Sequence, residues 1–176
     1  MASYAINHSR ELQPLSGDVG PSESDSPQRA ADASPGRCAD AIVSTLLAAG
    51  IDRIFGLPGG PISPVFHAAQ LRTLDVVGCC HEGTAAFAAA GYGRATGTHG
   101  VLVVTSGPGV LNALNAIAAA HADDSDLLVL VGEVATTNSG RGVLQDGSPD
   151  GLNMANVVAS VCSHVETVRH GSRVAA

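Results

Sequence analysis

The stretch Val101-Leu102-Val103-Val104-Thr105-Ser106-Gly107-Pro108-Gly109 decides the fold that this chain is predicted to adopt. Its first five residues show no polar alternation, which is typical of a strand buried on both faces of a parallel sheet. Ser106 to Gly109 reads as a tight turn, and Val110 to His121 has the apolar spacing of a helix. A buried strand, a glycine-rich turn and a helix in this order indicate an α/β fold.

The same alternation of strands and helices extends on both sides of that stretch. Further strands are predicted at Ile51 to Phe55, Asp75 to Cys80, Leu127 to Val131 and His164 to Val168. Further helices are predicted at Cys38 to Leu47, Ser63 to Leu71, Gly83 to Ala95 and Leu152 to Val161. The pattern predicts a doubly wound, mostly parallel sheet with helices on both faces.

The beginning of the chain has a different composition. Residues 1–36 are rich in Ser, Pro, Asp and Glu without a sustained hydrophobic period, so we expect a disordered tail there. Residues 37–176 are expected to form one domain, because a chain of 176 residues is too short for two ordinary ones. Ser172 to Ala176 has the composition of the start of another helix. Whether this domain lacks its last helix and strand is therefore an open question.

Charge and composition exclude several classes of function. The sequence contains no lysine, which removes Schiff-base chemistry, a pyridoxal phosphate anchor and the lysine of a P-loop. A formal net charge of -7 without a basic cluster, together with 3% aromatic residues, argues against a nucleic-acid partner. No apolar run reaches the ~20 residues of a membrane helix, and no signal-peptide core begins the chain, so we expect a cytoplasmic protein.

The four cysteines do not form a metal-binding pattern. Cys38, Cys79, Cys80 and Cys162 lack the paired spacing of zinc sites. We expect reduced thiols and no metal bound by this chain.

The loops that follow the predicted strands are the place to look for a site. They span residues 56–60, 81–83, 106–109 and 133–150, and each is rich in glycine or polar residues. Because ligands of open parallel sheets bind beyond the carboxyl ends of the strands, these loops are expected to converge on one edge.

Pattern alone leaves two questions open at this edge. Gly107-Pro108-Gly109 followed by Asn112 is similar to part of a dinucleotide-binding loop with Glu133 as the ribose acid, although Asn112 replaces the third glycine. Glu82 fits equally an exposed first-turn glutamate favoured by the helix dipole and a functional acid.

Taken in order, several segments resemble the pyrimidine-binding domain of thiamin diphosphate enzymes of the acetolactate synthase and 2-oxo acid decarboxylase superfamily. The similarity extends from about Arg37 to Val168. The matching segments are Phe55 to Gly60, His81-Glu82, Ala88 to Gly97, Val104 to Gly109, Asn112, Ala120 to Ser125, and Leu144-Gln145-Asp146.

The resemblance implies specific roles for two catalytic residues. In the family, the glutamate at the position of Glu82 hydrogen-bonds N1′ of the aminopyrimidine ring and promotes the tautomer that takes the proton from thiazolium C2. Gln145 is expected to reach toward the reacting carbon or the substrate.

The resemblance also implies the residues that bind the cofactor. Pro108 is expected to pack against the pyrimidine, and Asn112 to support that loop. Gly59 and Gly107 are expected in the cofactor-binding loops, and the loop containing Gly59 is expected to line the substrate side.

Some features depart from the family pattern. Leu57, Gly83 and Asp146 stand where other residues are common, which leaves the substrate open. The family binds the diphosphate and Mg²⁺ through a second domain with a Gly-Asp-Gly motif, and this sequence has no such motif. The resemblance therefore implies a partner domain or subunit with that motif, and a dimer or higher oligomer.

Three functional alternatives follow. The first is the pyrimidine-binding subunit of a split enzyme that acts on a 2-oxo acid by decarboxylation or carboligation, and is inactive in isolation. The second is a truncated or regulatory remnant without turnover. The third is a Rossmann-like or flavodoxin-like nucleotide-binding module that shares only the sheet.

Overall fold

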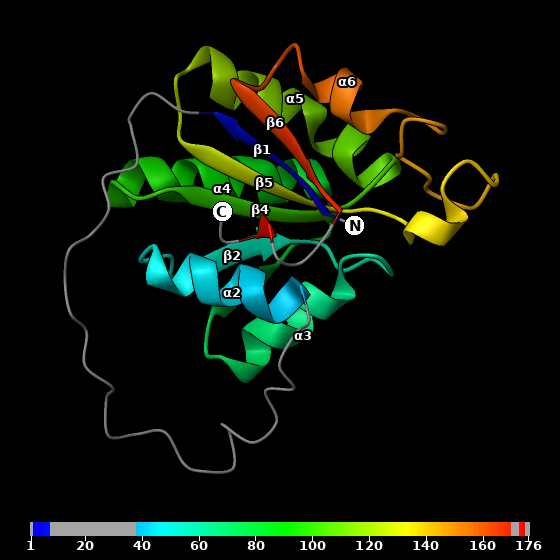
Figure 1. Cartoon of the computed structure of the whole chain (residues 1–176). Helices are drawn as coiled ribbons and strands as arrows, with labels where there is room; N and C mark the ends of the chain where they lie inside the picture. Colours follow the sequence, from blue (N-terminus) through cyan, green and yellow to red (C-terminus); the bar gives the residue numbers. More distant parts are fainter. Residues whose placement is uncertain (1, 8–37, 170–172, 175–176) are drawn as a thin grey trace.

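A computed structural model describes residues 2–7, 38–169 and 173–174 of the chain (Figure 1). The described strands are β1 (Ala2–Asn7), β2 (Arg53–Gly56), β3 (Asp75–Gly78), β4 (Gly100–Thr105), β5 (Leu127–Gly132) and β6 (His164–Val168). The described helices are α2 (Cys38–Ala48), α3 (Ser63–Leu71), α4 (Glu82–Thr96), α5 (Pro108–Ala122), α6 (Met154–Val158) and the short 3-10 helix η1 (Thr136–Asn138).

The strands form one six-stranded sheet in the order β3-β2-β4-β5-β1-β6. β2 pairs in parallel with β3 and with β4, and β4 pairs in parallel with β5. β1 is antiparallel to both of its neighbours, so β6 runs parallel to β5. The prediction of a mostly parallel α/β sheet is confirmed.

The strand β1 comes from the stretch that the sequence predicted as a tail. Ala2 is paired with Gly132 of β5 and with Val168 of β6, so the first strand of the chain lies between the last two (Figure 1). This six-residue strand forms its backbone hydrogen bonds with strands that are distant in sequence. Local composition carries no signal for such pairing. Residues 8–36 of the predicted tail lie outside the described residues.

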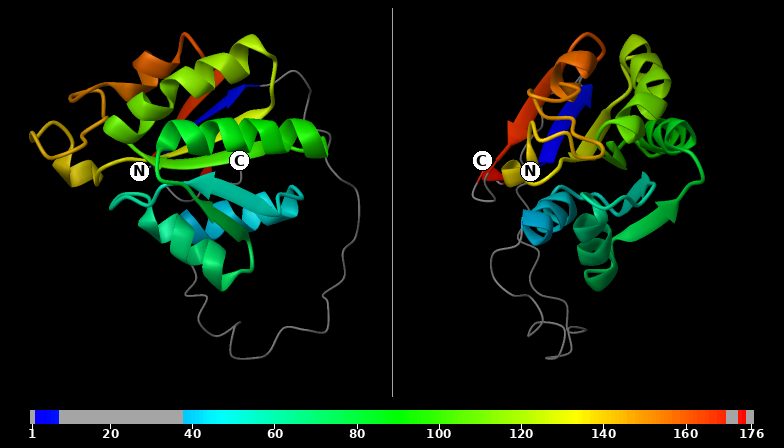
Figure 2. Two further views of the ribbon diagram at one scale, coloured as in Figure 1. Left: turned by 180° about the vertical axis from the view of Figure 1, so that it is seen from behind. Right: turned by 90° about the vertical axis from the view of Figure 1, so that its right-hand side faces the viewer.

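Helices cover both faces of the sheet, as predicted (Figure 2). Along β4, Val101 and Val103 face one side and belong to the core that contains the buried residues of α2 and α3. Leu102 and Val104 face the other side and pack in the core with the buried residues of α4 and α5. All four side chains have no exposed surface, which explains why the strand lacks polar alternation.

Two elements differ from their predicted bounds for local reasons. α5 begins at Pro108 and not at Val110, because proline is well suited to the first turn of a helix. α6 is shorter than the predicted helix at residues 152–161. It begins after Asn153, which has a φ of 50° in the left-handed region and breaks the helical path before Met154.

The chain order creates a topological switch point between β2 and β4. From β2 the chain moves to β3 on one side, and it then returns to place β4 on the other side of β2. The loops after β2 and β4 therefore leave the sheet in opposite directions, and ligands of open α/β sheets bind beyond the carboxyl ends of the strands at such a point. In the part of the chain that the structure describes, no helix combines the length and apolar character needed to cross a membrane.

Candidate functional site

Thr105, the last residue of β4, lies where the loops of the carboxyl edge meet. An added Cβ on Gly59, in the loop after β2, would lie 2.8 Å from Thr105 Cβ. An added Cβ on Gly109, in the first turn of α5, would lie 2.9 Å from Thr105 Cγ2. These distances are shorter than ordinary contacts between carbon atoms, so the two loops approach this strand end closely because both positions are glycine.

Glu82 is buried at the first turn of α4. His81 precedes it as the N-cap residue, with its Nδ1 accepting a hydrogen bond from the Gly83 amide at 3.0 Å. Only 8% of Glu82 is exposed, so the alternative of an exposed first-turn glutamate is wrong. Its Oε2 accepts a hydrogen bond of 3.0 Å from Asn112 Nδ2 on α5. The structure therefore brings together two of the residues that the sequence selected as site residues.

Gly109 lies beside this pair. An added Cβ at Gly109 would be 3.6 Å from Glu82 Oε1. Because the same position is 2.9 Å from the Thr105 methyl carbon, Gly109 joins the Glu82 pair to the end of β4. The carboxylate is thus held next to the glycine-rich turn.

Gln145 lies on the other side of Thr105. Its Oε1 accepts a hydrogen bond of 3.2 Å from Thr105 Oγ1. An added Cβ on Gly107 would lie 3.4 Å from Gln145 Cα, so these two predicted site residues are in contact. Gln145 has a φ of 64°, which is uncommon outside glycine and requires support from the surrounding structure.

Pro108 lies between the two groups of residues. It is the first residue of α5 and is exposed, with Gly107 and Gly109 on either side of it. The six predicted site residues therefore lie on the loops and helix starts of one sheet edge. Their chemical roles stay predictions.

Sequence reasoning did not select Thr105 or Ser106 as site residues. Thr105 could have been found as the polar end of an apolar strand. Ser106 is fully buried, and its Oγ donates a hydrogen bond to Glu133 Oε1. Glu133, the acid that the dinucleotide alternative assigned to a ribose, is 5% exposed and points into this contact.

Two carboxyl groups that contact the segment after Gln145 have shifted pKa values. Burial raises the pKa of Glu133, although hydrogen bonds from Ser106 and from the Gly147 amide oppose that shift. Hydrogen bonds from the Ser148 side chain and from the Gly140 amide lower the pKa of Asp146. The environment thus shifts the pKa values of the two acids in opposite directions.

Three large exposed apolar side chains belong to elements that contribute residues to the candidate site. Phe87 lies on α4, Leu111 on α5, and Leu144 directly before Gln145. Their exposed fractions are 51%, 46% and 86%.

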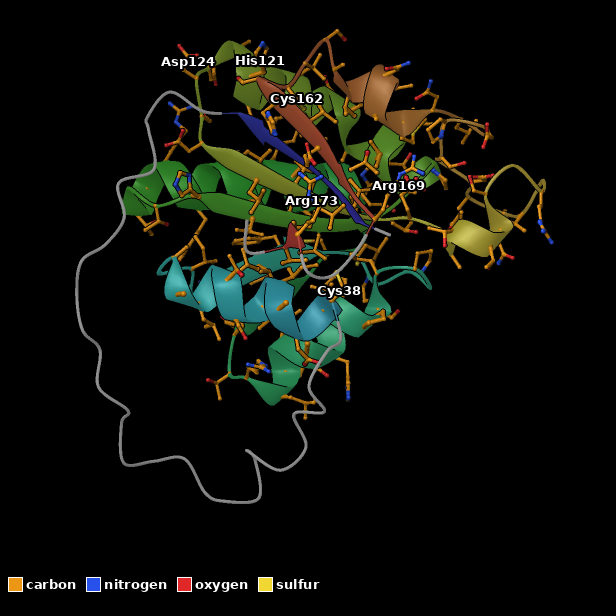
Figure 3. All side chains as sticks on the ribbon, in the orientation of Figure 1. Cys38, His121, Asp124, Cys162, Arg169 and Arg173 are labelled. Carbon is orange, nitrogen blue, oxygen red and sulfur yellow. The ribbon has the colours of Figure 1, made fainter. Side chains whose placement is uncertain are left out.

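Two cysteines lie in the cores of the sheet, and the other two, Cys79 and Cys80, directly precede His81 and Glu82 of the candidate site. Cys38, at the start of α2, and Cys162, before β6, belong to the cores on opposite faces of the sheet (Figure 3). All four cysteines are free thiols. Across residues 2–7, 38–169 and 173–174, no group of three or more His, Cys, Asp or Glu side chains is placed to hold a metal ion.

The fold and this edge define a doubly wound α/β domain that presents a buried carboxylate and glycine-rich loops at the switch point of its sheet. Domains of this class bind organic cofactors there. This chain belongs to the family described as thiamine pyrophosphate enzyme, N-terminal TPP binding domain, whose model matches residues 36–154. The resemblance expected from the sequence is confirmed.

Relatives of this chain carry two kinds of name. A 2-hydroxyacyl-CoA lyase 2 from Danio rerio is 38% identical over 136 residues, which cover 77% of this chain and 22% of the relative. Acetolactate synthase isozyme 2 large subunit from Escherichia coli K12 is 39% identical over 114 residues, or 65% of this chain and 21% of the relative. A probable acetolactate synthase large subunit from Methanocaldococcus jannaschii is 42% identical, covering 66% of this chain and 20% of the relative. The chain thus spans about a fifth of the length of these relatives.

Proposed function

We propose that this chain is the pyrimidine-binding part of a thiamin diphosphate enzyme that acts on a 2-oxo acid by decarboxylation or carboligation. The observation that carries the proposal is the buried Glu82 carboxyl, hydrogen-bonded to Asn112 beside the glycine-rich turn at the carboxyl edge. The names of the relatives, acetolactate synthase and 2-hydroxyacyl-CoA lyase, support the class of reaction.

The residues present fit the aminopyrimidine end of the cofactor. A carboxyl group can share a proton with a ring nitrogen, and Asn112 would hold the Glu82 carboxyl in one orientation while it does so. Gly59, Gly107 and Gly109 leave space that a Cβ would otherwise fill next to Thr105 or Gln145. When bound, thiamin diphosphate supplies the electron sink of the reaction.

Pro108 and Gln145 complete the proposed site. The exposed ring of Pro108 offers an apolar face against which a flat pyrimidine can pack. Thr105 donates to the carbonyl oxygen of the Gln145 side chain, which leaves the amide hydrogens of that side chain as donors for a substrate oxygen.

We further propose that a separate domain or subunit binds the diphosphate and Mg²⁺, and that the isolated chain is inactive. The exposed side chains of Phe87, Leu111 and Leu144 support a contact surface at the same edge as Glu82. The absence of Gly-Asp-Gly from this sequence agrees with a partner that carries this motif. The assembly is proposed to be a dimer or a higher oligomer.

The experiment that tests the proposal is reconstitution with the candidate partner. The chain is co-expressed with a subunit that carries Gly-Asp-Gly, titrated with thiamin diphosphate and screened against a panel of 2-oxo acids. We expect Glu82→Gln to lower turnover by about 10²–10⁴-fold, the usual contribution of a positioned acid or base. The matched control is Glu166→Gln on β6, where the carboxylate forms an ion pair with Arg173 at 3.8 Å.

The outcomes separate the alternatives. Loss of turnover in Glu82→Gln, with wild-type activity in Glu166→Gln and an intact complex in both, supports the proposal. Near-wild-type turnover in Glu82→Gln would refute it. A complex that binds thiamin diphosphate but converts none of the acids would favour the regulatory remnant.

A further inference from the structure

Ser106 and Glu133 occupy matching positions after two paired strands. Thr105 at the end of β4 is opposite Gly132 at the end of β5, and the Ser106 amide donates a hydrogen bond of 2.9 Å to the Gly132 carbonyl. One residue further on, Ser106 Oγ donates to Glu133 Oε1. Because Ser106 has no exposed surface and Glu133 is 5% exposed, this polar contact lies inside the protein.

The segment that carries Gln145 packs directly on this contact at Gly147. An added Cβ at Gly147 would collide with Ser106 Oγ, and it would lie 2.5 Å from Glu133 Oε1 and 2.8 Å from Met154 Cγ. The Gly147 amide also hydrogen-bonds to the Glu133 carboxyl. Glu133 thus holds the backbone at Gly147 and the side chain of Ser106 at the same time.

Gly147 is only two residues from Gln145, whose backbone has a φ of 64°. A conformation of this kind in a residue other than glycine persists only where neighbouring contacts impose it. The contacts on one side come from Thr105 and Gly107, which meet the side chain and Cα of Gln145. Those on the other side come through Gly147.

We propose that Glu133 is a positioning residue that, together with Ser106, fixes the segment carrying Gln145 against the turn at Gly107. The inference rests on the proposed function, in which Gln145 faces the reacting side of the site. It assigns a role to a buried acid that the proposed chemistry does not use.

The environment of the second carboxyl oxygen of Glu133 determines which substitutions test the proposal. Within the described residues, Glu133 Oε2 is buried and has no hydrogen-bond partner. Burial raises the pKa of Glu133, and the nearby Asp146 acts in the same direction. A neutral glutamine should therefore keep the geometry, because its side-chain oxygen can accept from Ser106 and from the Gly147 amide. Alanine removes both hydrogen bonds.

Hydrogen exchange of the full-length chain, read by mass spectrometry, tests the inference without cofactor or partner. We expect Glu133→Ala and Ser106→Ala to speed exchange in residues 144–154 by about ten-fold, which corresponds to about 1.4 kcal/mol. Protection of β4 should not change in these variants. Glu133→Gln should exchange at the wild-type rate, and the matched control Ser125→Ala removes a buried serine hydroxyl elsewhere in the chain.

A positioning role and a merely structural role give different results. Faster exchange confined to residues 144–154, and its restoration in Glu133→Gln, supports positioning. Wild-type exchange in Ser106→Ala, or an equal loss of protection in β4, would overturn it. If Glu133→Ala does not fold, Ser106→Ala and Glu133→Gln still decide the question. Failure of the Glu82→Gln experiment would leave this result untouched, because exchange is measured without turnover.

Discussion

Replacing Asn112 with alanine tests the contact at the centre of the proposed site. Asn112 is exposed, and substitutions on the surface usually change the free energy of unfolding by less than about 0.5 kcal/mol. A larger effect is expected here, because the substitution removes the donor that lies 3.0 Å from Glu82 Oε2. The carboxyl left behind is only 8% exposed.

The magnitude follows from two opposing contributions. Leaving a buried acceptor without its partner costs about 1–3 kcal/mol. Replacing asparagine by alanine inside a helix raises the free energy of unfolding by about 0.5 kcal/mol, because alanine has the higher helix propensity. We therefore expect Asn112→Ala to lower the free energy of unfolding by about 0.5–2.5 kcal/mol, the difference between these two contributions.

The matched control is Asn115→Ala on the same helix. Asn115 is also exposed, and its replacement should be neutral or stabilise the protein by about 0.5 kcal/mol. Comparing the two variants cancels helix propensity and leaves the contribution of the contact with Glu82. Urea unfolding gives this difference from the midpoints, provided that the slope of the transition is unchanged. Equal midpoints for Asn112→Ala and Asn115→Ala would refute the reasoning.

Two further predictions concern ionisation. Burial raises the pKa of Glu133 in the folded protein above its ordinary value of 4.5. The protonated Glu133 side chain therefore makes its full contribution to the free energy of unfolding below pH 4.5, and this contribution is lost as the pH rises through the raised pKa. Urea unfolding at pH values from about 4 to 8 should therefore show wild type losing stability relative to Glu133→Gln, and parallel curves would contradict this. Asp146, whose lowered pKa has the opposite effect on acidification, is present in both proteins, so the comparison reports Glu133 together with its charge interaction with Asp146. Among the thiols, we expect exposed Cys80 to be alkylated first and Cys162 last, because burial raises the pKa of Cys162 to about 11. Tandem mass spectrometry after brief alkylation measures the extent of modification of each cysteine. Equal rates for Cys80 and Cys162 would exclude this order.

The candidate site depends on contacts between neighbours in space as much as on its own residues. Thr105 is the clearest case, because its methyl group meets Gly109 and its hydroxyl binds Gln145. A threonine at the end of an apolar strand has many possible roles in a sequence. Only the approach of two loops from different parts of the chain makes this one the junction of the proposed site.

The sequence by itself determined the fold class, the family and the edge that carries the candidate site. The fold class and the edge follow from local signals: the apolar run at residues 101–105 requires burial on both faces, and glycine-rich turns follow the strands at regular intervals. The family follows from the ordered motifs that resemble it. Glu82 and Asn112 could be selected because the resemblance to the family assigns roles to these positions, although 30 residues separate them.

The tertiary structure alone decided the pairing of distant segments. It placed Ala2–Asn7 between β5 and β6, and it joined Ser106 to Glu133 beneath Gly147. Each of these depends on hydrogen bonds and packing between residues far apart in the chain, whose free energy appears only after the sheet has formed. Hydrophobic period and turn composition are local properties, so they carry no information about such partners.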